Sequence, residues 1–276
     1  MNDDVCAARG PGGGVLAGRT ILGVFAHPDD ESFACGGTLA RAADAGARVV
    51  LFCASRGEAG STSDPALVPD GDLGLERTAE LHRAAAVLGV ADVVVMHHAD
   101  GQLRWRDQLT LAADIVAAFQ RYQPDAVITF AEDGLYWHPD HIAVHERTNA
   151  SIRSLGDNAP PLYYVTLPPR RMREILEAIQ TSRSAPPDLS FWGIVPDAFG
   201  LAAQPPTFVV DVSDWTARKL EALRCHRTQV GADNPFQWID AEQARRFLGM
   251  EYFRRSPIES RRDAVLELLA DGNLRV

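Results

Sequence analysis

The feature that most constrains the fold is a regular alternation of apolar runs with amphipathic segments through the first two-thirds of the chain. Four short apolar runs predict buried strands: 21–26, 48–54, 92–96 and 125–130. Three segments between them have the apolar spacing of helices: 35–46, 76–88 and 109–122. Strands joined through helices form right-handed crossovers. The sequence therefore predicts an α/β protein with a Rossmann-like, mostly parallel sheet flanked by helices.

The last third of the chain has a weaker pattern. Residues 162–167 and 208–212 resemble strands, and Ser213 is a candidate cap for a helix that runs to about residue 229. The proline-rich stretch 183–206 predicts a long loop. We therefore expect a loop-rich C-terminal third.

The Gly-rich, polar residues 1–18 are typical of a flexible leader. We expect residues 19–276 to form a single domain, because a chain of this length can bury one substantial core.

The overall charge restricts the partners of the protein. A formal net charge of −10 and an isoelectric point near 5.2 disfavour nucleic acids and anionic membranes, which attract clusters of Lys and Arg. No apolar run approaches eighteen residues, and the N-terminal residues lack a signal-peptide pattern. The four cysteines form no CxxC pair. These features predict a cytoplasmic protein with a small-molecule partner; they leave the oligomeric state open, a homo-oligomer included.

Polar residues gather where the first and fourth predicted strands end, and parallel α/β sheets bind ligands beyond the carboxyl ends of their strands. The sequence after the first strand is His27-Pro28-Asp29-Asp30, and the segment after the fourth strand contains His138-Pro139-Asp140-His141. Either segment alone is a weak signal, since a His-Pro-Asp triplet is usually a turn. Their occurrence at the same edge of one sheet predicts a metal site.

The spacing within these segments indicates which residues can bind the metal and which can accept a proton. An imidazole and a carboxylate three residues apart, His27 and Asp30, can converge on one cation, and Zn²⁺ suits such a pair. Asp29 diverges from its neighbour and is left free to take a proton from water. If Pro139 opens a helix, His138 and His141 point toward one face, and one of them completes three protein ligands.

The segments AHPDDE (26–31) and HPDH (138–141), with the GGT at 36–38 between them, resemble the LmbE-like (PIG-L superfamily) zinc deacetylases and amidases. The late segment KLEALRCHRTQ (219–229) is similar to a further motif of this family. The family includes N-acetylglucosaminyl-inositol deacetylases of thiol biosynthesis, mycothiol conjugate amidases and deacetylases that modify antibiotics. The resemblance covers roughly residues 20–150 and this late segment, whereas residues 156–206 match no part of the family.

The resemblance implies specific roles for residues of this chain. His27, Asp30 and His141 would bind zinc, and Asp29 would be the general base. His138, as a cation, would stabilise the oxyanion, and Tyr136 would help to polarise the carbonyl group. Four further residues would lie at or near the substrate: Arg77, Asp100, Glu58 and His226. Trp137 departs from the small residue that usually precedes HPDH, which could reshape the substrate cleft.

We therefore expect a zinc-dependent hydrolase that removes an acyl group, namely acetyl, from an N-acetylglucosamine-type sugar conjugate. Fe²⁺ is an alternative metal for the same ligands. A first alternative function is an amidase that cleaves a larger thiol-conjugate or antibiotic-intermediate amide. A second is a non-catalytic metabolite-binding protein, although no ligand or base is missing. A nucleotide-dependent oxidoreductase is disfavoured because the chain lacks a G-x-G-x-x-G fingerprint.

Overall fold

The computed structural model describes residues 14–62, 64–106, 108–180 and 186–270. Its framework is a seven-stranded sheet of order β3-β2-β1-β4-β5-β7-β6. The strands are β1 (Thr20–Phe25), β2 (Arg48–Cys53), β3 (Asp92–Val95), β4 (Ala126–Phe130), β5 (Leu162–Thr166), β6 (Phe208–Asp211) and β7 (Met250–Arg255). The α-helices are α1 (Asp30–Asp44), α2 (Leu73–Leu88), α3 (Gln108–Tyr122), α4 (Gly134–Trp137), α5 (Pro139–Ser154), α6 (Arg171–Gln180), α7 (Thr216–Cys225) and α8 (Ala241–Leu248).

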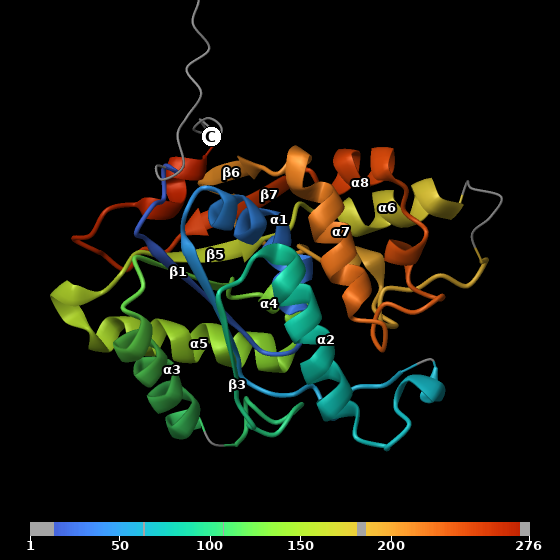
Figure 1. The fold of residues 1–276 in the computed structure, drawn as a ribbon, viewed down its shortest axis with the longest axis horizontal. Helices are drawn as coiled ribbons and strands as arrows, with labels where there is room; N and C mark the ends of the chain where they lie inside the picture. Colours follow the sequence, from blue (N-terminus) through green and yellow to red (C-terminus); the bar gives the residue numbers. More distant parts are fainter. Residues whose placement is uncertain (1–13, 63, 107, 181–185, 271–276) are drawn as a thin grey trace, which may run out of the picture.

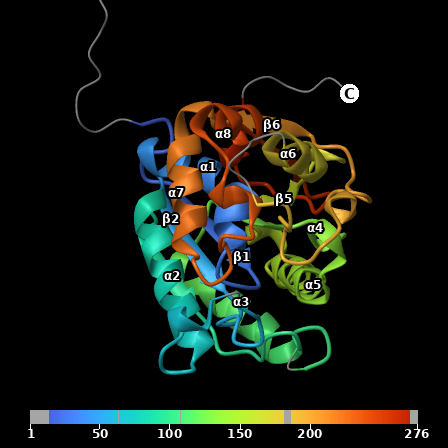
Figure 2. The same cartoon turned by 90° about the vertical axis from the view of Figure 1, so that its right-hand side faces the viewer.

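The first five strands form the parallel part of the sheet, as the sequence predicted. The side chains of β1 and β4 are almost completely buried because helices cover both faces of the sheet. Helices α1 and α2 lie on one face, and α3 and α5 pack together on the other (Figures 1 and 2). The strand order reverses at β1, between β2 and β4, so the carboxyl ends of β1 and β4 border the place where such sheets bind ligands.

Two helix boundaries differ from the predicted ones, and both differences affect the site. Helix α1 begins at Asp30 rather than at residue 35, so Asp29 becomes its N-cap residue. Helix α7 ends at Cys225 rather than near residue 229, because the backbone at His226 is not helical. The residues after α7 are held by a side chain of another helix. Glu80 of α2 accepts hydrogen bonds from the backbone N–H and the hydroxyl of Thr228.

The C-terminal third adds elements that the sequence pattern did not predict. Strand β7 pairs antiparallel with both β5 and β6, and α6 and α8 flank this part of the sheet. The described residues 186–206 contain only one short 3₁₀ turn as a helix and no strand of the sheet, in keeping with the predicted loop. Among the described residues, no helix combines the length and the apolar character that crossing a membrane requires.

The packed part of the chain begins before residue 19. Residues 1–13 of the predicted leader lie outside the described residues, but residues 14–18 form a turn against the domain. Within this turn the Leu16 side chain is fully buried, and its N–H donates to the carbonyl of Ala45. Residues 14–18 therefore pack against the domain, although one buried leucine among glycines gives little periodic signal in the sequence.

A buried ion pair joins α7 to the sheet and to α1. Lys219, the only lysine of the chain, pairs with Glu251 of β7, and both side chains are almost fully buried. Glu251 also accepts the backbone N–H groups of Gly37 and Thr38, at 2.9 and 2.7 Å, beyond the non-helical residue Cys35 of α1. The carboxylate thus replaces part of the hydrogen-bond ladder at an interruption of the helix.

Replacing Glu251 by Ala is expected to lower the free energy of unfolding by about 3–5 kcal/mol, because it leaves a buried ammonium group without its partner. Urea denaturation measures this loss. Glu242→Ala, at an exposed position of α8, is the control and should change stability by no more than about 0.5 kcal/mol. A Glu251→Ala variant as stable as the control would show that the pair contributes nothing.

Candidate active site

Three groups from the ends of β1 and β4 converge at the reversal of the strand order. His27 follows β1, Asp30 is the first residue of α1, and His141 lies in the first turn of α5. The His141 Nε2 atom lies 3.3 Å from His27 Nδ1 and 3.1 Å from Asp30 Oδ1. Asp30 Oδ2 is 3.5 Å from His27 Nδ1. The residues that the resemblance implies as metal ligands therefore face one another.

The hydrogen bonds on the far side of each ring decide which nitrogen atoms can bind a cation. His141 Nδ1 is 3.1 Å from the carbonyl oxygen of Gly134, so this nitrogen carries the proton and Nε2 presents a lone pair. Gly134 allows this approach: its φ is 55°, and a Cβ there would lie 2.9 Å from the Cβ of His141. His27 Nε2 faces Asp100 Oδ1 at 3.0 Å and Asp140 Oδ2 at 3.4 Å, so its Nδ1 presents the lone pair.

Two imidazole lone pairs and one carboxylate therefore point toward a common position, which is the donor set of a divalent metal such as zinc. Burial lowers the pKa of His27, but the carboxylates of Asp100, Asp140 and Asp30 outweigh burial and raise it well above its usual value. Burial raises the pKa of Asp30, but His141 and His27 lower it far more. Binding of a metal ion would therefore release the proton that this pKa holds on His27.

His138 lies beside this cluster but has the opposite arrangement of its ring. Its Nδ1 accepts the backbone N–H of Asp140 at 3.2 Å, which places the proton of a neutral ring on Nε2. The ring centroids of His141 and His27 lie 4.6 and 4.9 Å away. Burial and these two histidines lower the pKa of His138 to about 3. A neutral ring of this tautomer can donate a hydrogen bond from Nε2, in contrast to the cationic His138 that the resemblance implies.

His27, His138 and His141 each offer a ring nitrogen, and these three atoms all lie within 4.8 Å of one another. Distance alone thus admits His138 as a ligand. The hydrogen bond from Asp140 argues against it, because a ring that accepts at Nδ1 has no free lone pair on Nε2. We therefore favour His141 over His138.

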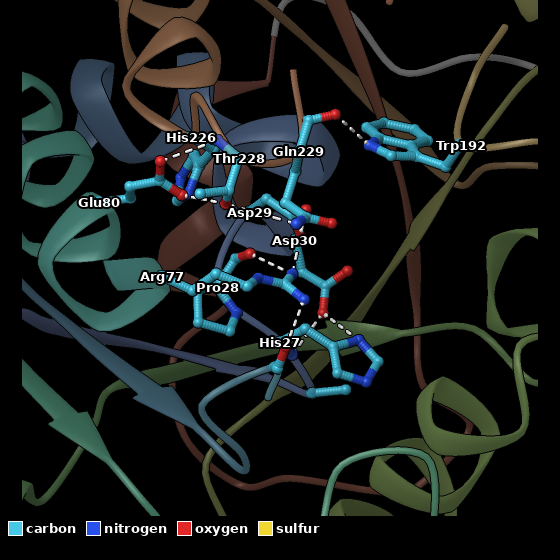
Figure 3. A network of polar contacts seen from close by, with 12 residues as sticks. His27, Pro28, Asp29, Asp30, Arg77, Glu80, Trp192, His226, Thr228 and Gln229 are labelled. Carbon is cyan, nitrogen blue, oxygen red and sulfur yellow. Dashed lines mark hydrogen bonds and ion pairs between the residues drawn. The ribbon is translucent and has the colours of Figure 1, made fainter. Parts of the chain in front are cut away.

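Asp29 borders the cavity next to the cluster and is held by Arg77. The Arg77 Nη2 atom lies 3.3 Å from Asp29 Oδ2, and Figure 3 shows the guanidinium group reaching Pro28 and Asp29 together. Burial raises the pKa of Asp29 to about 6, although the charge of Arg77 opposes this. Arg77 also donates to the carbonyl groups of Gly57 and Pro28, at 2.9 and 2.8 Å. Much of its hydrogen-bonding capacity is therefore used within the protein.

The other predicted substrate residues lie at different depths. Asp100 borders the cavity, and its contact with His27 outweighs burial and lowers its pKa to about 2. Glu58 lies behind Asp100 and accepts its backbone N–H at 3.1 Å. His226 is fully buried, and its Nε2 lies 2.9 Å from Glu31 Oε1. Burial lowers the pKa of His226, but Glu31 outweighs this and raises it. Neither Glu58 nor His226 lines the cavity.

The cavity itself has a volume of about 800 Å³, ample for a disaccharide-sized ligand. Tyr136 and His138 form part of its wall, with Trp137, whose surface is 55% exposed. Trp192 comes from the loop that matched no family segment, and its indole N–H donates to the Gln229 carbonyl at 3.0 Å (Figure 3). The unmatched region therefore contributes a wall of the site.

Sequence reasoning missed three residues that shape this site. Asp140 accepts the backbone N–H groups of Gly101 and Leu103 as well as facing His27, and the HPDH segment contained its signal. Glu31 lies inside AHPDDE, but the segment alone does not indicate which group its carboxylate contacts. Trp192 had no signal, because a tryptophan in an unmatched loop is not tied to any strand end.

Fold and site together define a class: a Rossmann-like protein in which the histidines and carboxylates typical of metal-dependent hydrolases meet at the reversal of the strand order. Comparison with known families then identifies this chain further. Residues 22–152 match the PIG-L family, GlcNAc-PI de-N-acetylase. The chain is 34% identical over 265 residues to the 1D-myo-inositol 2-acetamido-2-deoxy-alpha-D-glucopyranoside deacetylase of Acidothermus cellulolyticus, covering 85% of this chain and 88% of that protein. The chain belongs to the PIG-L family, and its predicted class, a deacetylase that hydrolyses a non-peptide C–N bond, is confirmed.

Solved structures support the fold. The N,N'-diacetylchitobiose deacetylase of Pyrococcus horikoshii superimposes with a TM-score of 0.60 at 24% identity, over 87% of this chain and 84% of that one. A zinc-inhibited form of the teicoplanin deacetylase Orf2 superimposes with a TM-score of 0.54 at 22% identity, over 87% of this chain and all of that one. At these identities the likeness extends to the fold alone.

Proposed function

We propose that this chain removes the acetyl group from an N-acetylglucosaminyl-inositol, with a zinc ion held by His27, Asp30 and His141. The orientation of the ring lone pairs carries this proposal, because it separates two ligand histidines from one donor histidine. The name of the Acidothermus relative supports the choice of substrate. Fe²⁺ would suit the same ligands, so the native metal belongs to the tests.

When bound, the metal would polarise the acetyl carbonyl and make a nearby water molecule more acidic. Asp29 lies beside this position, and its raised pKa suits a base that accepts a proton from the attacking water. The Nε2–H of His138 and the hydroxyl of Tyr136 can donate to the oxygen that gains negative charge. Asp29, once protonated, is the simplest donor to the leaving amine, and His138 is its rival.

The walls of the cavity would hold the rest of the substrate. Asp100 and Arg77 border the cavity beside Asp29, where hydroxyl groups of a sugar could reach them. Glu58 would act by holding the backbone of Asp100. The volume of the cavity and its two tryptophans also leave room for a second candidate, an amidase that cleaves a larger conjugate.

A panel of substrates tests the proposal. We expect amine release from N-acetylglucosaminyl-inositol with a kcat/KM at least about tenfold above that for free N-acetylglucosamine, a difference of ~1.4 kcal/mol in binding the transition state. Amine release can be followed by a fluorogenic amine reagent. Cleavage of a larger thiol-conjugate amide without deacetylation of either sugar would contradict the proposal and support the amidase.

A further inference from the structure

The backbone of Asp29 is held in an unfavourable conformation. Its φ is 124° and its ψ is −25°, a region that residues other than glycine rarely adopt and that costs on the order of 1–3 kcal/mol. Its carbonyl group accepts the backbone N–H groups of Ser32 and Phe33 at 3.1 and 3.0 Å, as the start of α1 requires. An acceptor for the Asp29 N–H would anchor this conformation from the other side.

Glu31 supplies that anchor. Its Oε2 accepts the backbone N–H of Asp29 at 3.1 Å, and its side chain is almost completely buried. Its other oxygen accepts the hydroxyl of Ser32 at 2.6 Å and lies 2.9 Å from His226 Nε2. A buried carboxylate is tolerated only where it is paired and hydrogen-bonded, and these contacts satisfy that requirement.

The partner of Glu31 comes from a distant part of the chain. His226 follows the end of α7, in the residues that Glu80 holds through Thr228, and Figure 3 shows His226 and Thr228 side by side next to Glu80. The His226 ring is fully buried, and its Nδ1 has no hydrogen-bond partner among the described residues. Its Nε2 atom is directed at Glu31, and the Ser32 hydroxyl lies 3.5 Å from the same atom.

We propose that Glu31 and His226 are positioning residues that hold the strained Asp29 backbone, so that the Asp29 carboxylate faces the cavity beside Arg77. His226 orients Glu31, and Glu31 fixes the Asp29 N–H. This proposal rests on the proposed role of Asp29 as the general base. It replaces the expected contact of His226 with substrate, because a fully buried ring behind the cavity wall does not reach a ligand.

Four variants test the proposal: Glu31→Ala, Glu31→Gln, His226→Ala and the control Glu251→Ala. Glu251 is a matched control because it is also a buried carboxylate that accepts backbone N–H groups of α1, but at Gly37 and Thr38. We expect Glu31→Ala and His226→Ala to lower kcat about 10–100-fold, with KM and metal content nearly unchanged. Glu31→Gln should recover most of kcat, since its amide oxygen can still accept the Asp29 N–H. Glu251→Ala should lose stability but keep kcat.

Crystal structures of Glu31→Ala and Glu251→Ala provide a readout that does not depend on turnover. We expect Asp29 to leave the positive-φ region in the first and to keep it in the second. An unchanged Asp29 backbone in Glu31→Ala would overturn the proposal, as would a His226→Ala variant with raised KM and normal kcat. A wild-type chain that releases no amine from any substrate would instead refute the proposed function, and the two crystal structures would still decide the positioning role.

Discussion

Replacing Asp29 by Asn is expected to lower kcat by about a thousandfold while the protein keeps its metal, because general bases contribute roughly 10²–10⁴ in rate. Asn has the shape of Asp, and its amide oxygen can still accept from Arg77. It cannot accept a proton from water at neutral pH. Asp29 is also not one of the proposed metal ligands, which are His27, Asp30 and His141. Metal binding should therefore survive the substitution.

The measurement is amine release under saturating substrate, together with elemental analysis of the same preparation. Asp44→Asn is the matched control, because Asp44 is the last residue of α1 and pairs with Arg218, away from the site. It should keep the wild-type kcat. If Asp29→Asn instead lost its metal, Asp29 would be a ligand and our assignment of the base would be wrong.

Replacing Asp30 or His141 by Ala is expected to remove metal affinity and turnover together. Each change takes away one of three converging donors, and even residues that merely support a ligand contribute about 10–100-fold to metal affinity. We therefore expect the Kd for zinc to rise by more than about 100-fold. Competition with a chromophoric chelator measures this constant directly.

His145→Ala is the control for this pair of variants. His145 lies one turn beyond His141 on α5, but its Nδ1 is directed at the Phe130 carbonyl, 2.9 Å away. It should bind zinc as the wild type does. Equal losses of metal in Asp29→Asn, Asp30→Ala and His141→Ala would abolish the distinction between base and ligands.

Much of the parallel sheet could be predicted because its strands are buried on both faces. Strands β1 and β4 consist almost entirely of apolar residues, as central strands of such sheets require. Strand β1 precedes His27, and β4 precedes the loop that contains His138. Helix α6 also carried a signal, since Met172, Ile175 and Ile179 repeat at helical spacing and are the buried residues of that helix. The prolines that follow it in the sequence are typical of a loop and mask this signal.

Strand β7 could not be predicted from its own residues. Its sequence MEYFRR contains three charged residues, and its place between β5 and β6 depends on partners that are far away in the chain. The charge of Glu251 is tolerated there because Lys219 approaches from α7. Propensity gives no information about such a strand, because the tertiary pairing decides its conformation.

The candidate site was predictable where neighbours in sequence are neighbours in space. His27, Asp29 and Asp30 lie within one turn, so their spacing predicted which side chains converge and which diverges. The lowered pKa of His138 was not predictable, since it depends on burial and on two other rings brought in by the fold. The same holds for His226, whose burial against Glu31 joins segments almost two hundred residues apart.

Metal content measured by elemental analysis, paired with amine release before and after chelation, tests the central claim most directly. The account predicts about one zinc ion per chain, loss of amine release from N-acetylglucosaminyl-inositol when a chelator removes the metal, and recovery when zinc is returned. Full amine release from a metal-free chain, or no metal binding after reconstitution, would contradict it.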